Sequence, residues 1–97
     1  MRRMGTDQTQ AELDQQRIAA NVRAEMARAG MTLIRLAERL DIPYSVLQRR
    51  ASGTVPFRVQ ELVEIGRVLG VYPSIFFNGI TLTNTPPTPL TPEEDAI

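Results

Sequence analysis

Apolar residues recur at every third or fourth position through most of the first eighty residues, and this spacing predicts amphipathic helices. The first stripe lies between residues 12 and 30 and consists of Ile18, Val22, Met26 and Ala29. Gly30 follows the stripe, at the place where glycine adopts the left-handed conformation that ends many helices. We therefore expect one helix from residue 12 to Gly30, with Leu13 able to extend it toward the amino end.

A second, shorter stripe begins directly after Gly30. Thr32 is a suitable N-cap for it, because a threonine hydroxyl can accept a hydrogen bond from the first turn of a helix. The apolar positions of this helix are Leu33, Leu36, Ala37 and Leu40. The sequence Asp41-Ile42-Pro43 interrupts the stripe, since the residue before a proline is disfavoured in a helix. The interruption is short, which predicts a tight turn.

A third helix is expected to start at Pro43 or Tyr44, since proline suits the first position of a helix. Its inward-facing residues are Val46, Leu47 and Ala51. Ser52-Gly53 stops the helix, and its other face is polar. The segment 44–47 also fits a strand, but the proline before it and the polar residues 48–50 after it favour the helix.

The clearest apolar stripe in the chain predicts a fourth helix, which Gly70 ends. Its members are Val59, Leu62, Val63, Ile65, Gly66 and Leu69. Pro73 then opens a last short turn, and Asn78-Gly79 directs the chain away. No alternating run predicts a strand. The expected fold is all-α, a compact bundle of four to five short helices.

The two ends of the chain differ in composition from this helical part. Residues 81–97 contain four of the seven prolines together with threonines and acids, so we expect a disordered acidic tail. Residues 1–11 are rich in polar side chains and are expected to form a flexible arm. The predicted organisation is therefore an arm over residues 1–11, one domain over residues 12–80 and a tail over residues 81–97.

Composition excludes several kinds of chemistry. The 97 residues suffice for one small domain, and they include no cysteine and no histidine. Disulfides, thiol nucleophiles, histidine-based catalysis and the usual zinc ligands are thereby removed. No Gly-rich phosphate loop is present, so we expect neither an enzyme nor a bound cofactor or metal. No apolar run approaches the roughly 20 residues of a membrane span, and the start lacks a signal-peptide core, which predicts a cytoplasmic protein without membrane contact.

The net charge of zero conceals a segregation of charge along the chain. All eleven basic residues are arginine, and residues 17–80 contain nine of them against five acidic residues, 9 − 5 = +4. The tail, with three acidic residues, has a charge of −3. A basic folded unit is what attraction to a polyanion requires, although a solvated surface explains the same charge. Guanidinium groups also make forked hydrogen bonds to phosphate and guanine.

Two short helices joined by a tight turn, the second with a polar outer face, form a helix-turn-helix. The segment AGMTLIRLAERLDIPYSVLQRRASG, followed by LVEIGRVLGV, resembles the phage repressor and Cro type of helix-turn-helix domain, also called XRE-like. The resemblance covers residues 18–77. It is carried by Gly30, Thr32, Leu36, Ala37, Leu40, Leu47, Ser52, Gly53, Leu62, Ile65, Leu69, Gly70 and Val71.

The resemblance implies a lambda repressor-like fold and a sequence-specific DNA-binding transcription regulator, a repressor of bacterial or phage origin. Its partner is double-stranded DNA with a pseudo-palindromic operator. The base-contacting residues that it implies, on the third helix, are Tyr44, Ser45, Gln48 and Arg49. The residues that it lays along the DNA backbone are Thr32, Arg35, Arg50, Ser52, Thr54 and Arg58. The alternative is that these are ordinary surface residues, with Arg50 paired to a nearby acid.

Three positions depart from the pattern of that family. Leu33 stands where the family often has a phosphate-binding Gln, Asp41 where its turn often has Gly, and Pro43 where Ser or Thr often caps the third helix. Leu33 is expected to cover the core or to lie against a sugar, and Asp41 is expected to repel DNA. These differences bear on affinity more than on the fold.

A homodimer is expected because one short helix reads only a few base pairs. Related repressors pair through the region after the fourth helix and so hold two reading helices about 34 Å apart. The contact set implied here is Tyr72, Ile75, Phe76 and Phe77. A terminal aromatic residue also commonly closes the core of a monomer, and we expect one phenylalanine to serve each purpose.

Two further expectations concern other contacts. Arg23 and Arg67 are interpreted as structural residues that bridge to Glu38 or Glu64. The alternative function is a protein-interaction module, such as an antitoxin whose C-terminal tail, with Ile97 as a late apolar residue, binds a partner protein.

Overall fold

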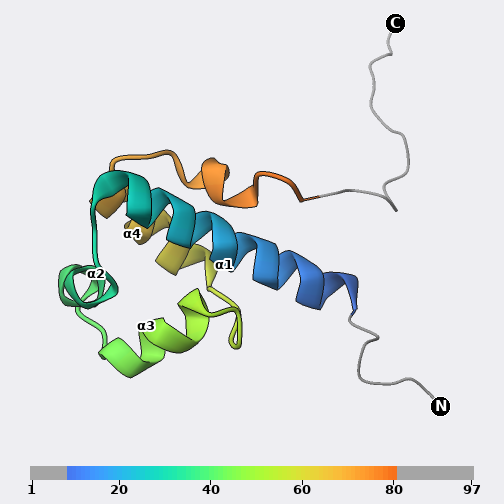
Figure 1. The fold of residues 1–97 in the computed structure, drawn as a ribbon, viewed down its shortest axis with the longest axis horizontal. Helices are drawn as coiled ribbons and strands as arrows, with labels where there is room; N and C mark the ends of the chain where they lie inside the picture. Colours follow the sequence, from blue (N-terminus) through green and yellow to red (C-terminus); the bar gives the residue numbers. More distant parts are fainter. Residues whose placement is uncertain (1–8, 81–97) are drawn as a thin grey trace, which may run out of the picture.

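The computed structural model describes residues 9–80, and no strand occurs among them. The expected tail, residues 81–97, and residues 1–8 of the expected arm lie outside the described residues. The described chain is helical and compact (Figure 1), which confirms the predicted all-α bundle. Its elements are α1 (Gln10–Ala29), α2 (Leu33–Leu40), α3 (Tyr44–Ala51), α4 (Val59–Leu69) and the 3-10 helix η1 (Pro73–Phe77). None of the helices within residues 9–80 has both the length and the apolar character needed to cross a bilayer.

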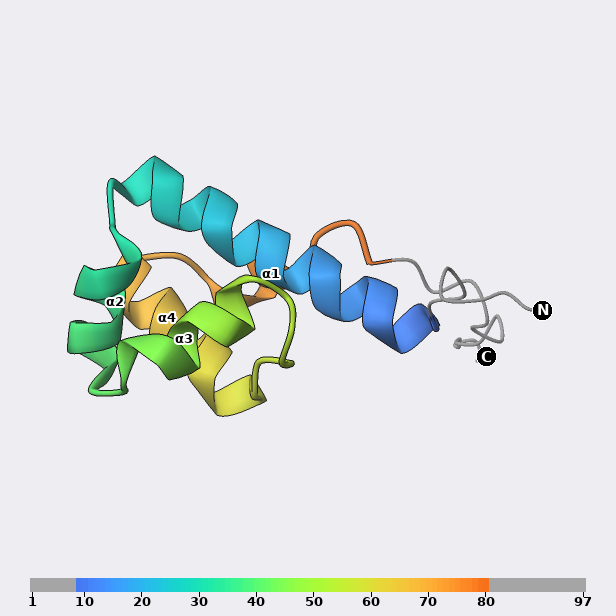
Figure 2. The same cartoon turned by 60° about the horizontal axis from the view of Figure 1, so that its bottom comes forward.

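Helix α1 begins two residues before the boundary expected from the sequence. The Thr9 hydroxyl accepts a hydrogen bond from the Glu12 amide at 3.1 Å, and the Glu12 carboxylate accepts one from the Thr9 amide at 3.0 Å. This reciprocal capping satisfies two amides at the start of the helix. The first turns of α1 extend beyond the other helices (Figure 2), which is why they lack a buried apolar stripe. Gly30, with φ 67°, ends the helix as predicted.

Each helix and η1 contribute one large side chain to the centre of the core. The five largest fully buried side chains are Val22, Leu36, Leu47, Ile65 and Phe76. Burial of an aliphatic or aromatic side chain of this size contributes roughly 1.5–3 kcal/mol. The core therefore depends on all five elements, and the short η1 turn belongs to it as much as the longer helices do.

A close approach to Gly66 brings the chain after α4 back across that helix. A Cβ atom at this position would lie 2.8 Å from the Val71 carbonyl oxygen and 2.9 Å from Cγ of Pro73. Both distances are shorter than the contacts that a Cβ atom makes in proteins, so a side chain at this position would clash and only glycine permits the crossing. The crossing directs η1 toward α1.

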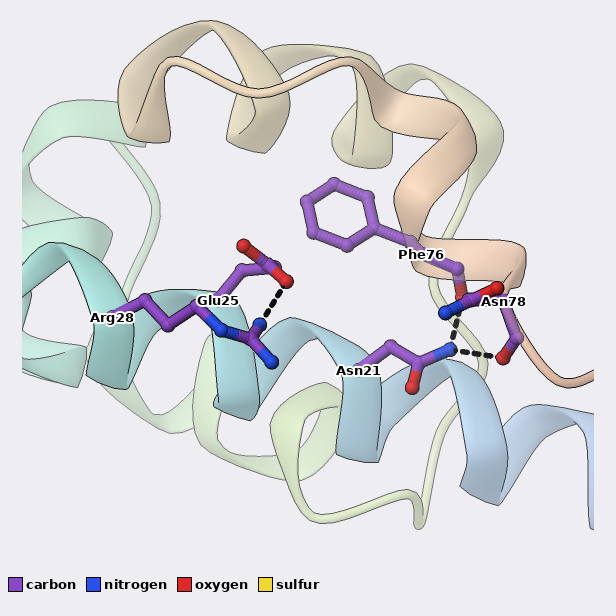
Figure 3. A network of polar contacts seen from close by, with 5 residues as sticks. All are labelled: Asn21, Glu25, Arg28, Phe76 and Asn78. Carbon is purple, nitrogen blue, oxygen red and sulfur yellow. Dashed lines mark hydrogen bonds and ion pairs between the residues drawn. The ribbon is translucent and has the colours of Figure 1, made fainter.

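Asn21 joins η1 to α1 through one side-chain amide. Its Nδ2 atom donates hydrogen bonds to the carbonyl oxygen of Phe76 at 2.9 Å and to that of Asn78 at 2.7 Å (Figure 3). Two carbonyl groups at the end of η1 are thereby satisfied by one donor group. Along the same side of α1, the buried carboxylate of Glu25 is paired with Arg28. The two bonds from Asn21 hold the backbone of η1 beside α1, next to the buried Phe76.

Candidate nucleic-acid interface

Helices α2 and α3 are joined by three residues, in the order helix, turn, helix (Figure 1). Asp41 ends α2 with φ 59° and ψ 46°, the left-handed conformation that glycine adopts most easily. Among the described residues it is the one non-glycine residue with a positive φ. The turn therefore keeps the conformation expected of glycine although an aspartate occupies it.

Of the two expected starts of this helix, Pro43 and Tyr44, the structure shows Tyr44, and Pro43 lies immediately before α3 as its N-cap. Its φ of −61° and ψ of 142° are extended, and it makes no side-chain capping hydrogen bond. Its carbonyl oxygen accepts hydrogen bonds from the Val46 and Leu47 amides at 3.1 and 3.2 Å. Helix α3 thus begins at Tyr44 without a side chain covering its first amides.

Leu33, the first residue of α2, packs against the core cluster and is partly buried. Of the two places expected for this side chain, the structure shows the one over the core. Leu33 has no amide or hydroxyl to replace the glutamine that the resemblance expects here, so the polar side chains at this end of α2 are those of Thr32 and Arg35.

Helix α3 presents two distinct faces. Leu47 and Ala51 are buried, with exposed fractions of 1% and 4%. The four predicted base-contacting residues lie together on the opposite, exposed face: Tyr44, Ser45, Gln48 and Arg49. Within residues 9–80, the side chains of Gln48 and Arg49 form no hydrogen bond or ion pair. Their amide and guanidinium groups are therefore directed to the surroundings of the helix and not to other described side chains.

Two α1 side chains hold the carboxyl-terminal end of α3. The Gln15 side-chain amide donates to the Gly53 carbonyl oxygen at 2.7 Å, and the Arg23 guanidinium donates to the Ala51 carbonyl oxygen. The expected partner of Arg23 was a carboxylate, and that prediction was wrong. Its partner is a carbonyl at a helix end, where a cation is favoured by the helix dipole. Gln15 was not singled out from the sequence, because nothing local marks a partner 38 positions away.

Arg67 also differs from the expectation. Within residues 9–80 no ion pair joins it to Glu38 or Glu64. The Glu64 carboxylate instead accepts a hydrogen bond from the Gln60 side chain at 3.4 Å, one helical turn earlier. Arg67 is an exposed residue on α4 and gives no described contact to α3.

The six residues predicted to contact the DNA backbone fall into two groups. Thr32, Arg35 and Arg58 are exposed at the starts of α2 and α4. The Thr32 hydroxyl accepts a hydrogen bond from the Arg35 amide at 3.1 Å. Because this bond uses a lone pair of the hydroxyl oxygen, it does not use the hydroxyl proton. Thr32 thus keeps a proton with which it can bind phosphate.

The hydroxyls of Ser52 and Thr54 are engaged within the protein. Ser52 Oγ donates to the Arg49 carbonyl oxygen at 3.0 Å, and it lies 3.0 Å from Thr54 Oγ1. A serine hydroxyl has one proton, so Thr54 must donate in the second contact. Both protons are then used internally. What remains on these oxygens are lone pairs, which do not bind an anion.

Arg50 is also turned toward the protein. Its side chain is 14% exposed, and its Nε atom lies 3.0 Å from Oε1 of Glu61, in the first turn of α4. The sequence left open whether Arg50 meets phosphate or a nearby acid, and the structure shows the acid. Ser52, Thr54 and Arg50, from the predicted backbone set, thus have partners inside the fold.

The predicted dimer contacts include one residue that belongs to the core. Phe76 is completely buried, so its side chain is not accessible to a second copy, and its place in the contact set is corrected. Tyr72 is 85% exposed and Phe77 is 44% exposed, whereas Ile75 is partly buried against the core. Phe76 is buried and Phe77 exposed because they are neighbours in a short helical turn and point in different directions.

Comparisons of the chain with protein-family models, with curated proteins and with solved structures found no match in any of the three. The features of this chain that bear on function are therefore the helix-turn-helix geometry and the residues that α3 presents.

Proposed function

We propose that this protein is a sequence-specific DNA-binding transcription regulator that places α3 in the major groove of double-stranded DNA. The observation that supports this most directly is the exposed face of α3, where Tyr44, Ser45, Gln48 and Arg49 lie together. The major groove of B-DNA is wide enough for one α-helix. Helix α2 packs against α3 through the tight turn and braces it for this contact.

The side chains on this face have the chemistry of base recognition. Arg49 can donate two parallel hydrogen bonds to O6 and N7 of guanine, and Gln48 can pair with N6 and N7 of adenine. The ring of Tyr44, 44% exposed, can pack on a thymine methyl group. Ser45 can bond to either kind of base. One good forked pair contributes about 1–3 kcal/mol of discrimination between bases.

Contacts to the DNA backbone are assigned to the exposed members of the predicted set: Thr32, Arg35 and Arg58. The Thr32 hydroxyl proton and the two guanidinium groups are suitable donors to phosphate oxygens. The net charge of +4 over residues 17–80 adds a general attraction to the polyanion.

Two copies of the chain are proposed to bind a pseudo-palindromic operator, with Tyr72 and Phe77 in the contact between them. Such a pair places its reading helices about 34 Å apart, one turn of B-DNA. Occupying an operator in this way hinders polymerase, so we propose that the regulator is a repressor.

Selection of binding sites from a random duplex pool tests this function. We expect enrichment of a site with two related halves. Arg49→Ala is expected to reduce discrimination at one position in each half-site by about 10- to 100-fold, the size of one forked contact. Arg67→Ala removes the same charge from an exposed position on α4 and is expected to leave discrimination unchanged. Absence of any enriched site at low salt would contradict the proposal.

A further inference from the structure

The Glu61 carboxylate contacts one backbone amide and one guanidinium group. Its Oε1 atom accepts a hydrogen bond from the Arg58 amide, at the start of α4, at 2.8 Å. The same oxygen lies 3.0 Å from Nε of Arg50. The Glu61 side chain is 20% exposed and that of Arg50 is 14% exposed, so both charges are largely withdrawn from water. Screening by solvent is correspondingly weaker than for a surface pair.

A backbone amide at a helix start and a guanidinium group are also the groups that bind a DNA phosphate, and here they contact the Glu61 carboxylate. Helix starts bind phosphate through backbone amides, and guanidinium groups bind it through charge and hydrogen bonds. Arg50 directly follows Arg49, which faces away from the core on the surface assigned to DNA. An internal carboxylate therefore occupies the anion position next to the reading helix.

The contact between Arg50 and Glu61 is ionic and does not complete the hydrogen bonding of Arg50. The Nε atom is buried, and although Oε1 of Glu61 is 3.0 Å away, the geometry is not that of a hydrogen bond. Charge attraction is then what the contact with Glu61 contributes to holding the guanidinium toward α4. Neutralising Glu61 removes this attraction, and the long arginine side chain can then turn toward another anion.

We propose that Glu61 is an internal counter-anion that keeps Arg50 from DNA phosphates and so sets the strength and the salt dependence of DNA binding. The inference rests on the proposed function. A phosphate contact strengthens binding to all sequences alike, because it involves no base edge. Glu61 therefore lowers the affinity for every DNA without altering the preference for the operator.

Glu61→Gln tests the proposal with little change to the fold, since glutamine at this position can still accept from the Arg58 amide. Glu64→Gln is the matched control, because it removes the same charge from α4 at a carboxylate whose described partner is Gln60. The dissociation constants for the selected operator and for a random duplex are measured by fluorescence anisotropy between 50 and 200 mM salt.

For Glu61→Gln we expect the slope of log affinity against log salt to steepen by about 0.9, the value for one additional phosphate contact. Over this fourfold range of salt, the variant then loses about threefold more affinity than the wild-type protein. At low salt its affinity rises equally for operator and random duplex. Glu64→Gln leaves the slope unchanged, and Arg50→Met abolishes the effect of Glu61→Gln.

Equal slopes for Glu61→Gln and Glu64→Gln would overturn the inference while leaving the proposed function intact. A changed ratio between operator and random duplex would also overturn it, since Glu61 would then position α3. If neither the wild-type protein nor any variant binds DNA, the proposed function and the inference fall together. Should Glu61→Gln fail to fold, Arg50→Met alone decides: an unchanged slope supports the inference, and a slope smaller by about 0.9 overturns it.

Discussion

The guanidinium group of Arg23, on α1, donates a hydrogen bond to the carbonyl oxygen of Ala51, the last residue of α3. Gln15 holds the Gly53 carbonyl beside it at 2.7 Å. The other end of α3 begins after Pro43 with no side-chain capping bond. Helix α3 is therefore tied to α1 at its carboxyl-terminal end, which is the end nearer to Arg49.

Replacement of Arg23 by methionine keeps much of the side-chain volume and removes the donor. A hydrogen bond from a charged donor contributes about 1.5–3 kcal/mol, and Arg23 is an exposed residue, so we expect the free energy of unfolding to fall by about 1–2 kcal/mol. Urea denaturation measures this change. Arg67→Met, at an exposed position without a described contact to α3, is the control and is expected to stay within about 0.5 kcal/mol of the wild-type protein. Equal losses for the two variants would show that the α3 anchor contributes nothing.

Substitutions of Asn21 test how much its amide donor contributes to stability, because aspartate replaces the donor by an acceptor of nearly the same shape. Its amide donates to the Phe76 and Asn78 carbonyl oxygens. Asn21→Ala leaves both carbonyls without this donor and is expected to cost about 1–3 kcal/mol. Asn21→Asp is expected to cost more, because an ionised carboxylate is an acceptor facing two further acceptors. Thermal unfolding of the three proteins at neutral pH measures the order, and an Asp variant as stable as the Ala variant would contradict it.

The elements of the fold could be predicted from the sequence because each buries an apolar face. The stripe that includes Leu36 and the one that includes Ile65 each repeat at helical spacing, and Gly30 and Gly70 end helices in the left-handed conformation as expected. The first turns of α1 are exposed, so no stripe marked them. The local signal that marks this helix start is the capping pair of Thr9 and Glu12.

The contacts around α3 could not be predicted in the same way. Gln15 and Asn21 bind carbonyl groups 38 or more positions away, and any residue type supplies a carbonyl. Arg50 and Glu61 lie on different helices, so no helical spacing relates them. The sequence could identify which residues α3 presents on its polar face. It could not show that the Ser52 hydroxyl donates to the Arg49 carbonyl oxygen and that the Thr54 hydroxyl donates to Ser52.

The left-handed backbone of Asp41 is expected to lower stability, and its negative charge is expected to lower the affinity for DNA. Two substitutions separate these effects. A non-glycine residue in the left-handed conformation costs roughly 1 kcal/mol, although aspartate and asparagine tolerate it better than most. Asp41→Gly relieves this cost but gives the unfolded chain more freedom, so we expect a change in stability within about 1 kcal/mol. Asp41→Asn keeps the backbone preference and removes a negative charge beside the surface assigned to DNA.

Both Asp41 variants are expected to bind DNA more tightly than the wild-type protein, and to a similar extent, because both remove the same charge. Anisotropy titrations at low and high salt measure this, and the gain is expected to shrink as salt screens the charge. A gain confined to Asp41→Gly would instead assign the effect to the conformation of the turn.

Phe76 and Phe77 are adjacent in η1 but are expected to give opposite results when each is replaced by serine. Phe76 is fully buried, so Phe76→Ser leaves a cavity and a buried hydroxyl, and we expect a loss of at least about 3–5 kcal/mol in the free energy of unfolding. Phe77 is 44% exposed, and Phe77→Ser is expected to cost less than about 1.5 kcal/mol.

If Phe77 and Tyr72 form the contact between two copies, Phe77→Ser and Tyr72→Ser are expected to weaken self-association by tenfold or more while the monomer stays folded. Sedimentation velocity over a range of protein concentrations measures self-association, and circular dichroism checks the fold. Val59→Ser is the control, because Val59 is 72% exposed at the start of α4, outside η1. If all three variants associate as the wild-type protein does, the contact between copies lies elsewhere.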